Sequence, residues 1–375
     1  MQRILVWDVP TRVFHWMLAA CFALAWLTSE SDVWLSHHVF LGYVMLGLVG
    51  FRVLWGCVGG VYARFGSFRF SPRQGLAYLR EVLAGGAARH IGHNPAGSQA
   101  IYLLLPLIVV VAVSGVFAMG ADEQHGVAAG WMGFAAGRFL KQLHEASAIF
   151  MLLVVAGHVV GVGLESRLHQ ENLARSMLTG YKLAGDETPA SKPHRTVAAL
   201  LVALLLASGV AWFFYAPQQP EGVSVRVAFV GPALAVNARW RDECGSCHLD
   251  FHPSLLPRRS WVRLMEQQGQ HFGVDLGLDS ATVAALLVFA SANASEGHQT
   301  EPAFKIDSSI PSQAVPLRIT DTPYWTRKHR DVAAQDWQAP WIKSKANCQA
   351  CHADAPAGAF EDGSMHIPRS APAAR

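Results

Sequence analysis

The stretch LHEASAIFMLLVVAGHVV runs from Leu143 to Val160 and places two histidines in an almost wholly apolar segment. An imidazole has polar nitrogens that need partners, so its burial in hydrocarbon is costly. Fourteen residues at a rise of about 1.5 Å put His144 and His158 about 21 Å apart along a helix. Fourteen steps of about 100° fall about 40° short of four turns, so both rings point to nearly the same face. We expect a membrane helix that holds one buried cofactor near each membrane surface.

The composition also indicates a membrane protein. Of the 375 residues, 51% are hydrophobic and only 15% are charged, and the mean hydropathy is positive. The formal net charge of +3 is small and no basic stripe is present, so nucleic-acid binding is not expected. No small-residue cleavage site follows the first apolar segment, which we interpret as a retained anchor. Five segments have about the 20 apolar residues that a membrane span needs: 13–29, 38–57, 99–118, 142–164 and 196–216.

Four of the six cysteines form two identical patterns, Cys244-Gly-Ser-Cys247-His248 and Cys348-Gln-Ala-Cys351-His352. C-x-x-C-H is the attachment signature of a c-type haem, in which both thiols bond to the haem and the histidine becomes the proximal iron ligand. Two complete matches in one region favour covalent haem over a redox-active dithiol or half of a zinc site. Cys21 and Cys57 lie in or beside apolar spans, and we interpret them as packing residues.

Lysine and arginine predict the orientation of the chain in the membrane. Twelve of them lie at the N-terminus and in the loops 58–98 and 165–195, whereas the opposite short loops contain only Arg138 and Lys141. We therefore expect a cytoplasmic N-terminus and, after five crossings of the bacterial inner membrane, a periplasmic C-terminal domain. Bacteria attach c-type haems in the periplasm, so the two C-x-x-C-H motifs and the distribution of Lys and Arg predict the same location for this domain.

The soluble region is expected to begin with the Pro- and Gln-containing sequence APQQPEGVS, after the fifth span. Residues 258–269 and 279–294 read as helices, the second capped by Asp279 or Ser280. The polar stretch 295–318 is expected to link two haem-bearing halves.

The topology suggests which histidines share a haem in the membrane. His15 and His158 lie at the cytoplasmic ends of the first and fourth spans, and His38 and His144 lie at the opposite ends of the second and fourth. We expect each pair to ligate one b-type haem from both faces, which suits electron transfer better than oxygen chemistry. His37 is the less favoured neighbour, because Gly42 lies one turn from His38 and leaves room for a porphyrin. A core histidine bonded to a neighbouring helix is the alternative for each. Arg12 and Arg52 are candidate partners of the haem propionates, or they snorkel to the surface.

Several stretches resemble the bacterial cytochrome b561 family, which is related to the cytochrome b subunits of nickel–iron hydrogenases. They are WDVPTRVFHW, HVFLGYVMLGLVGFRVLWG, GHNPAGSQA and LHEASAIFMLLVVAGHVV…ENLARSMLTG. The resemblance covers about residues 1–185. It implies a four-helix bundle that binds two b haems and exchanges electrons with quinone, and its matched histidines are the four named above.

Residues 235–370 are similar to the dihaem cytochrome c family, through CGSCHLDFHPSLLPRRSW, QHFG, TPYWTRKH and ANCQACHADAPAGAF. The family implies histidine on both faces of each c haem. The matching distal ligands are His271 for the first haem and His329 for the second. The chemistry of the side chains alone also permits His252, His298, His366, Met265 or Met365. His252 is too close in sequence to His248 to reach the other face of the same haem, although it could ligate the other one.

The expected fold is therefore all-α, with a transmembrane dihaem b bundle over 1–185, a fifth transmembrane helix and linker over 186–217, and a mainly helical and irregular dihaem c domain over 218–375. We expect two b haems, two c haems and a quinone substrate. Electrons would pass from quinol in the lipid membrane to a soluble periplasmic haem protein such as a cytochrome c, a quinol:cytochrome c oxidoreductase-type activity. Fusion would hold the c haems at high effective concentration near the b haems.

Three other functions are compatible with these motifs. The first is the cytochrome anchor of a larger, hydrogenase-type oxidoreductase. The second is a peroxidase or reductase acting at a c haem with an open coordination site, and the third is a haem-based redox sensor. The quinone type, the direction of electron flow and the oligomeric state, including a homodimer, stay open.

Overall fold

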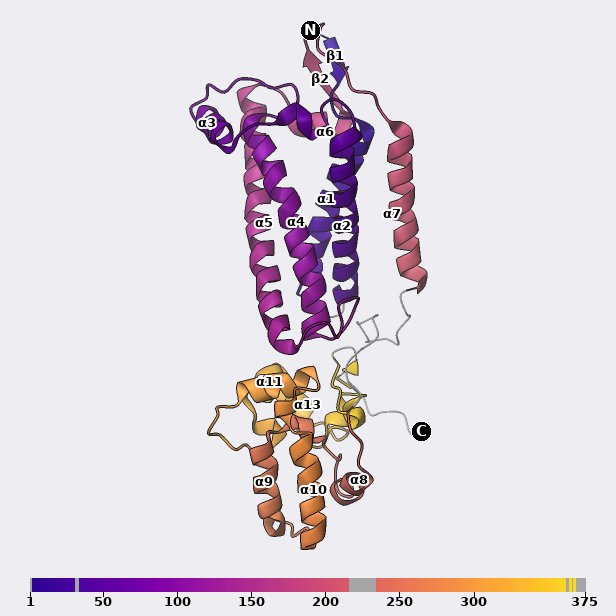
Figure 1. The fold of residues 1–375 in the computed structure, drawn as a ribbon, viewed down its shortest axis with the longest axis vertical. Helices are drawn as coiled ribbons and strands as arrows, with labels where there is room; N and C mark the ends of the chain where they lie inside the picture. Colours follow the sequence, from indigo (N-terminus) through magenta and orange to yellow (C-terminus); the bar gives the residue numbers. More distant parts are fainter. Residues whose placement is uncertain (1, 31–33, 216–233, 362–363, 366, 369–375) are drawn as a thin grey trace. The chain divides into compact units, whose positions relative to one another are not determined.

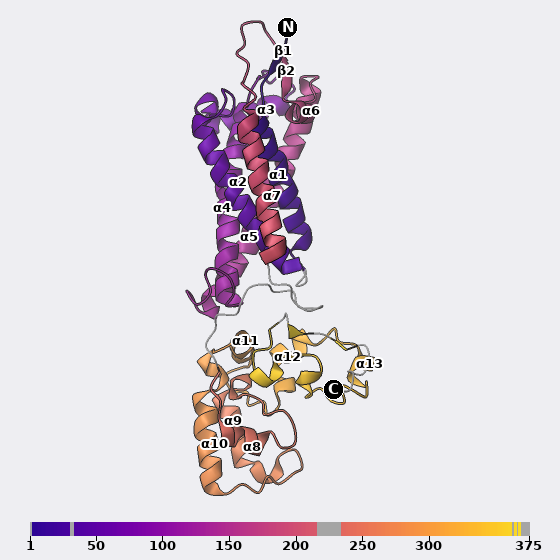
Figure 2. The same cartoon turned by 90° about the vertical axis from the view of Figure 1, so that its right-hand side faces the viewer.

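The computed structural model describes residues 2–30, 34–215, 234–361, 364–365 and 367–368. The chain forms two compact units. The first comprises Met1–Ala118 and Phe139–Pro217, and the second comprises Met119–Arg138 and Gln218–Arg375 (Figures 1 and 2). The predicted all-α class is confirmed, and the loop after the third membrane helix belongs to the second unit.

Five helices of the described chain are long and apolar enough to cross a membrane. They overlap all five predicted spans, so the chain is a multi-pass membrane protein. Their bounds are α1 Val9–Thr28, α2 Leu35–Val58, α4 Pro95–Asp122, α5 Phe134–Leu168 and α7 Arg195–Tyr215.

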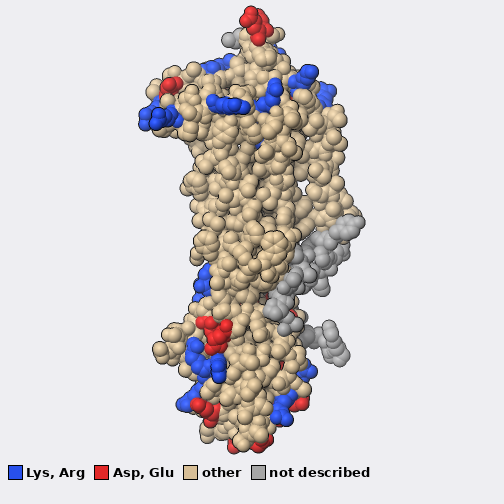
Figure 3. Space-filling model, in the orientation of Figure 1, with Lys and Arg blue, Asp and Glu red and all other residues tan. Residues whose placement is uncertain are grey.

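The core of the first unit lies where α1, α2, α4, α5 and α7 meet. Its buried side chains include Phe14, Leu48, Ile108 and Met151. Leu201 of α7 belongs to the same core, so the fifth helix is part of the bundle. Many apolar side chains on the outside are exposed, as expected for a surface that faces lipid. In Figure 3, Lys and Arg side chains gather at the end of this unit that carries the short helix α3 (Pro72–Leu83), and the adjoining band is almost uncharged.

Asp8 determines where α1 begins. Its carboxylate accepts a hydrogen bond from the Thr11 backbone N–H at 2.9 Å, which caps the helix, and Pro10 occupies the first turn. The same carboxylate accepts the indole N–H of Trp55 on α2 at 3.2 Å. Because Asp8 is only 1% exposed, this one side chain sets the register between α1 and the end of α2.

A two-stranded antiparallel sheet closes one end of the first unit, and the sequence did not indicate it. Strand β1 (Gln2–Leu5) pairs with β2 (Tyr181–Ala184), which follows the short helix α6 (Leu173–Thr179). Gly180 joins α6 to β2 with a φ of +89°, and a Cβ there would lie 2.7 Å from the Trp7 carbonyl oxygen. Only glycine fits this turn without strain.

The second unit is built from short helices separated by irregular segments. They are α8 Ala238–Cys244, η3 Pro253–Leu255, α9 Arg258–Glu266, η4 Gln268–Gln270, α10 Ser280–Ala292, η5 Ser295–Gly297, α11 Glu301–Ser309, η6 Ile319–Asp321, α12 Pro323–Lys328, α13 Ala334–Trp337, η7 Cys348–Ala350 and η8 Ala355–Ala357. Both predicted helices, α9 and α10, are confirmed. Asp279 is the cap of α10, because its carboxylate accepts from the Ala281 and Thr282 N–H groups. Trp240, Trp261 and Leu286 anchor the core.

Residues 295–318, which we expect to link the two haem-bearing halves, form a folded part of the second unit. This stretch contains η5 and α11, whose Ala303, Phe304 and Ile306 are buried. The low hydrophobicity of α11 concealed a single apolar face that packs into the unit. The expected start of the soluble region, APQQPEGVS, lies outside the described residues.

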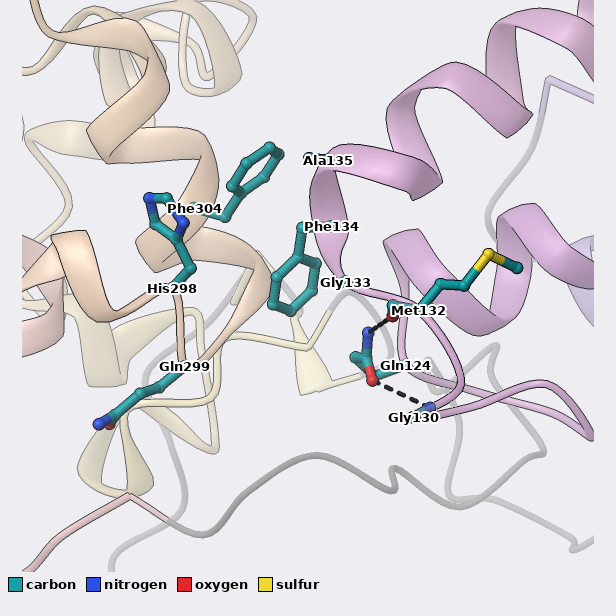
Figure 4. A pocket seen from close by; sticks show the side chains of 9 residues that line it. All are labelled: Gln124, Gly130, Met132, Gly133, Phe134, Ala135, His298, Gln299 and Phe304. Atoms are coloured by element: carbon teal, nitrogen blue, oxygen red, sulfur yellow. Dashed lines mark hydrogen bonds between the residues drawn. The ribbon is translucent and has the colours of Figure 1, made fainter.

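The loop 119–138 packs on α11 within the second unit. The Phe134 and Phe304 rings stack at 5.6 Å, and His125 Nε2 lies 2.8 Å from Glu361 Oε2. Lys305 of α11 contacts Asp122 at 3.8 Å and also pairs with Glu301. Figure 4 shows the residues that line a cavity between these elements, and the cavity has a volume of about 470 Å³. The Gln124 side chain donates a hydrogen bond to the Met132 carbonyl and accepts one from the Gly130 N–H.

We predict that Asp8→Ala destabilises the first unit by about 2 kcal/mol, because it removes a helix cap and leaves the buried Trp55 N–H without an acceptor. Thermal unfolding in detergent, followed by tryptophan fluorescence, measures this loss. Glu187→Ala changes an exposed carboxylate and is the matched control. Equal midpoints for the two variants would contradict the role of Asp8.

Candidate functional site

The structure brings the four membrane histidines together in the two expected pairs. The rings of His15 on α1 and His158 on α5 lie 6.5 Å apart between centroids. The rings of His38 on α2 and His144 on α5 lie 5.9 Å apart. His37, the neighbour of His38 that we did not favour as a ligand, instead packs its ring against that of Trp34, with centroids 5.0 Å apart.

These separations suit an iron held between two imidazoles. A metal bonded to two imidazole nitrogens at about 2 Å each, with each ring centre roughly 1 Å behind its nitrogen, puts the ring centres about 6 Å apart. The spacing of both pairs thus leaves room for a metal ion.

Backbone carbonyls hold the second pair in the orientation that metal ligation needs. His38 Nδ1 lies 2.9 Å from the Ala25 carbonyl oxygen, and His144 Nδ1 lies 2.8 Å from that of Val111. A proton on Nδ1 that is donated to a carbonyl leaves the Nε2 lone pair for a metal. Both rings therefore have one nitrogen satisfied by protein and the other available to a ligand.

Glycines shape the space around these rings. A Cβ added at Gly42, one turn from His38, or at Gly161, one turn from His158, would meet no atom within 4 Å. This open space is where a planar macrocycle could lie. Gly115 on α4 acts differently, since its Cβ would come within 2.9 Å of the Cε1 and Nδ1 atoms of His144. Only a residue without a side chain lets α4 approach this ring.

Several polar atoms at the His15 end of the bundle are buried without a protein partner among the described residues. They are Arg12 Nε, His15 Nδ1, Arg52 Nη1 and His93 Nδ1. Arg52 is only 3% exposed, and its guanidinium lies 4.7 Å from the centre of the Phe65 ring. Unpaired buried donors are costly. A ligand with carboxylates, such as a haem with its propionates, would satisfy them, and Arg12 and Arg52 are the two arginines expected there.

The sequence analysis did not single out His93. Its ring lies 4.8 Å from that of Trp7 and 4.3 Å from that of Phe68. Burial, together with the nearby positive charges of Arg52 and Lys182, lowers the pKa of His93 to about 3. The ring is therefore neutral at physiological pH. Its position just before α4, in the quoted motif GHNPAGSQA, was the one available signal.

The second unit contains two similar histidine pairs, each with a C-x-x-C-H histidine. His248 and His271 have ring centroids 6.3 Å apart, and His329 and His352 lie 6.2 Å apart. His248 Nδ1 lies 2.7 Å from the Leu249 carbonyl oxygen, and His329 Nδ1 lies 2.9 Å from that of Trp325. Burial lowers the pKa of both His271 and His329, which favours the neutral form that binds metal.

Most of the other candidate ligands have different partners. Both ring nitrogens of His252 are engaged, by Ser254 and by the Ala235 carbonyl. His298 Nε2 lies 2.8 Å from Asp307 Oδ2. Met265 is buried in the hydrophobic core around Trp261, whereas Met365 is 41% exposed. His366 lies outside the described residues.

The first cysteine of each motif is not activated as a thiolate. Burial raises the pKa of Cys244 to about 12 and that of Cys348 to about 11. Reactive dithiols and metal thiolates instead need a lowered pKa. Each motif offers two thiols and one histidine, and a second histidine faces each one, which is a donor set that fits a covalent haem.

Comparison with known proteins agrees with this division of the chain. Residues 6–180 match the family model described as prokaryotic cytochrome b561, and residues 240–360 match that of dihaem cytochrome c. The helix α7 lies outside both ranges.

Individual relatives match one part each. A probable Ni/Fe-hydrogenase B-type cytochrome subunit of Azotobacter vinelandii is 24% identical over 222 residues, which cover 50% of this chain and 91% of that protein. A probable Ni/Fe-hydrogenase 1 B-type cytochrome subunit of Escherichia coli K12 is 23% identical over 216 residues, covering 47% and 89%. A solved diheme cytochrome c from Rhodobacter sphaeroides is 32% identical, covers 34% of this chain and 100% of its own, and has a TM-score of 0.31.

We predict that Gly115→Ala removes or weakens one b haem, because the new methyl group displaces His144. The b-type α-band should lose part of its absorbance while the c-type band is unchanged. Gly163→Ala on α5 is the control, since its Cβ would meet no atom within 4 Å. Full b-haem content in Gly115→Ala would show that b-haem binding does not need the close approach of α4 to the His144 ring.

A second prediction concerns the distal side of the first c haem. His271→Ala should leave the haem covalently attached but convert its iron to the high-spin form, because one axial ligand is lost. Absorption and electron paramagnetic resonance spectra report the spin state. His298→Ala removes a histidine that pairs with Asp307 and should leave both c haems low-spin. A high-spin signal in His298→Ala and not in His271→Ala would show that His298, and not His271, is the distal ligand.

Proposed function

The chain joins a cytochrome b561 region to a dihaem cytochrome c region, and we propose that it carries electrons from quinol in the membrane through two b haems to two c haems and on to a soluble acceptor. Both matched families are cytochromes, which supports electron transfer through haem. The observation that carries the proposal is the set of four histidine pairs, spaced at 5.9–6.5 Å between ring centroids.

Each histidine pair is proposed to hold one iron. His15 and His158 would bind one b haem, and His38 and His144 the other. The two C-x-x-C-H motifs would attach the c haems through Cys244, Cys247, Cys348 and Cys351, with His248 and His352 as proximal ligands and His271 and His329 as distal ones. A haem with two protein ligands supplies reversible one-electron chemistry and has no open position for oxygen.

The remaining residues would position the b haems and exclude water. Arg12 and Arg52 would bind propionates at the His15 end, where their unpaired nitrogens lie. The carbonyls of Ala25 and Val111 fix the rings of His38 and His144. The buried core around Leu48 and Ile108 lowers the local dielectric constant, which strengthens every charge interaction with the cofactor.

We propose that the His15 end of the bundle faces the cytoplasm and that the second unit is periplasmic. The clustering of Lys and Arg near α3, β1 and β2 (Figure 3) supports this orientation. The C-x-x-C-H motifs support it too, because covalent haem attachment takes place outside the bacterial inner membrane. A soluble cytochrome c-like protein in the periplasm would then be the acceptor, and the quinone pool in the lipid the donor.

Fusion of the two regions would favour transfer between them. Two separate proteins meet by diffusion, whereas a tether makes their encounter intramolecular and sets an effective concentration.

A second candidate is the cytochrome anchor of a larger oxidoreductase, and the names of the curated relatives favour it. In that case a catalytic subunit, such as a hydrogenase, would deliver electrons to this chain. Stable co-purification with a large redox partner would support the anchor role. A peroxidase-type reaction at a c haem is less favoured, because a second histidine faces each motif histidine and closes the site.

We predict that a quinol reduces the b haems first and the c haems after them. The purified holoprotein is oxidised in detergent without oxygen, quinol is added, and the b- and c-type α-bands are followed separately. His144→Ala should stop c-haem reduction by quinol while dithionite still reduces the c haems, because it removes a proposed ligand on the route between them.

The other outcomes of this experiment decide between the candidates. If quinol moves neither band although dithionite reduces both, quinol is not the donor. Reduction of all bands by a co-purified dehydrogenase would then favour the anchor function. If the c haems are reduced as fast in His144→Ala as in the wild type, the route does not pass through that site.

A further inference from the structure

A groove of about 710 Å³ runs between α2 and α7 in the first unit. Its wall on α2 extends from Phe40 to Leu54, which is about 21 Å of helix. Its wall on α7 extends from Val197 to Ser208. Almost all of its lining is apolar. The groove depends on α7, which neither family model includes.

Two glycines keep this groove open. Gly47 and Gly50 lie on the α2 wall, and a Cβ at either position would meet no atom within 4 Å. The absence of side chains at these two positions therefore leaves space between the two helices. An apolar groove of this length fits a linear hydrocarbon chain.

The polar groups of the groove gather at one end of it. Tyr43 and Ser208 are its polar lining residues, and both lie toward the end where Trp212 stacks on Phe40 with ring centroids 4.9 Å apart. The indole N–H of Trp212 is buried and has no hydrogen-bond acceptor among the described residues. A buried donor without a partner is costly, so this N–H favours an acceptor from a bound molecule.

The same end carries the ligands of a proposed haem. Phe40 follows His38 by two residues, and His38 faces His144 at 5.9 Å. A molecule whose polar head lies beside Trp212 and Tyr43 would be next to the helix turn that holds this histidine. The opposite end of the groove, at Leu54 and Val197, offers only hydrocarbon contacts.

We propose that this groove binds an isoprenoid quinol, with the tail between α2 and α7 and the head at the Trp212 end. The inference rests on the proposed function, since it names where that donor binds. The head would lie against Tyr43 and Ser208, the polar lining residues. Its oxygen would accept from the N–H of Trp212, which stacks on the lining residue Phe40. Oxidation of one quinol to quinone releases two protons to water and two electrons, which reduce two ferric b haems by one electron each.

An isoprenoid quinol fits these features better than a phospholipid. A phospholipid has a charged headgroup, whereas the groove has no charged side chain in its lining. A quinone head is flat, neutral and rich in hydrogen-bond acceptors. It can stack beside the Phe40 ring and accept from an indole N–H at the same time.

The test uses the full-length holoprotein in lipid nanodiscs and a photoreactive quinone with an isoprenoid tail. The variants are Gly47→Leu, which fills the groove from α2, Leu204→Trp, which fills it from α7, and Trp212→Phe, which removes the donor but keeps the ring. Gly163→Leu adds the same bulk on α5, where a Cβ meets no atom within 4 Å, and is the matched control. Unchanged b- and c-haem spectra show that each variant is folded.

We expect the probe to label peptides of α2 and α7 in the wild type and in Gly163→Leu, and to lose this labelling in both filled variants. Trp212→Phe should raise the quinol KM for b-haem reduction about fivefold, as expected for one lost hydrogen bond. Competition by excess unlabelled quinone, but not by phospholipid, identifies the occupant.

The outcomes separate this inference from the proposed function. If quinol reduces the haems equally well in the wild type and in both filled variants, the donor function stands and the groove is not its site. If the groove is labelled but quinol reduces no haem in the wild type, the groove binds quinone and the electron route is wrong. Labelling outside α2 and α7, or equal competition by phospholipid, would overturn the assignment.

Discussion

The first unit depends on the burial of four imidazoles in a membrane bundle. Burial of an imidazole in hydrocarbon without hydrogen-bond partners costs several kcal/mol. Helix α5 alone contains two such imidazoles, those of His144 and His158. The costs are offset when each ring donates from Nδ1 to a carbonyl and binds a metal through Nε2. His38 and His144 already have the first of these bonds, to Ala25 and Val111. Since the carbonyls belong to neighbouring helices, α1 and α4, the orientation of each ligand also ties two helices together.

Glycines next to the histidines determine how much space surrounds each ring. The hydrogen bond between His144 and Val111 requires α4 to approach α5 closely, and Gly115, one turn beyond Val111, permits this. The opposite requirement holds near His38 and His158, where Gly42 and Gly161 leave open space. One residue type thus serves two purposes: close contact where a ring must be held, and a void where a macrocycle would lie.

Much of this architecture was predictable from the sequence because it is periodic or local. The five spans follow from hydropathy, and the pairs His15–His158 and His38–His144 follow from helix rise and alternating topology. The capping of α10 by Asp279 follows from local chemistry. The features that were missed are those made by distant contacts. His93 packs between Trp7 and Phe68. Strand β1 pairs with β2 although almost the whole membrane region separates them in the sequence. Helix α11 has a buried apolar face within a stretch that is polar on average. No window of sequence contains both partners of such contacts.

The fifth helix shows why a tether is more than a connector. A simple anchor needs only about 20 apolar residues, and any apolar face would serve. Yet α7 buries Leu201 in the core of the bundle and packs Trp212 on Phe40, so its rotation about its own axis is fixed. A fixed helix beside the glycines of α2 leaves a space, and the N–H of the neighbouring Trp212 has no acceptor among the described residues. The same contacts that secure the helix to the bundle therefore create the groove. An α7 that was only a tether could turn its small or its bulky side toward α2 without consequence, whereas this one presents a stacked indole next to the helix turn of His38.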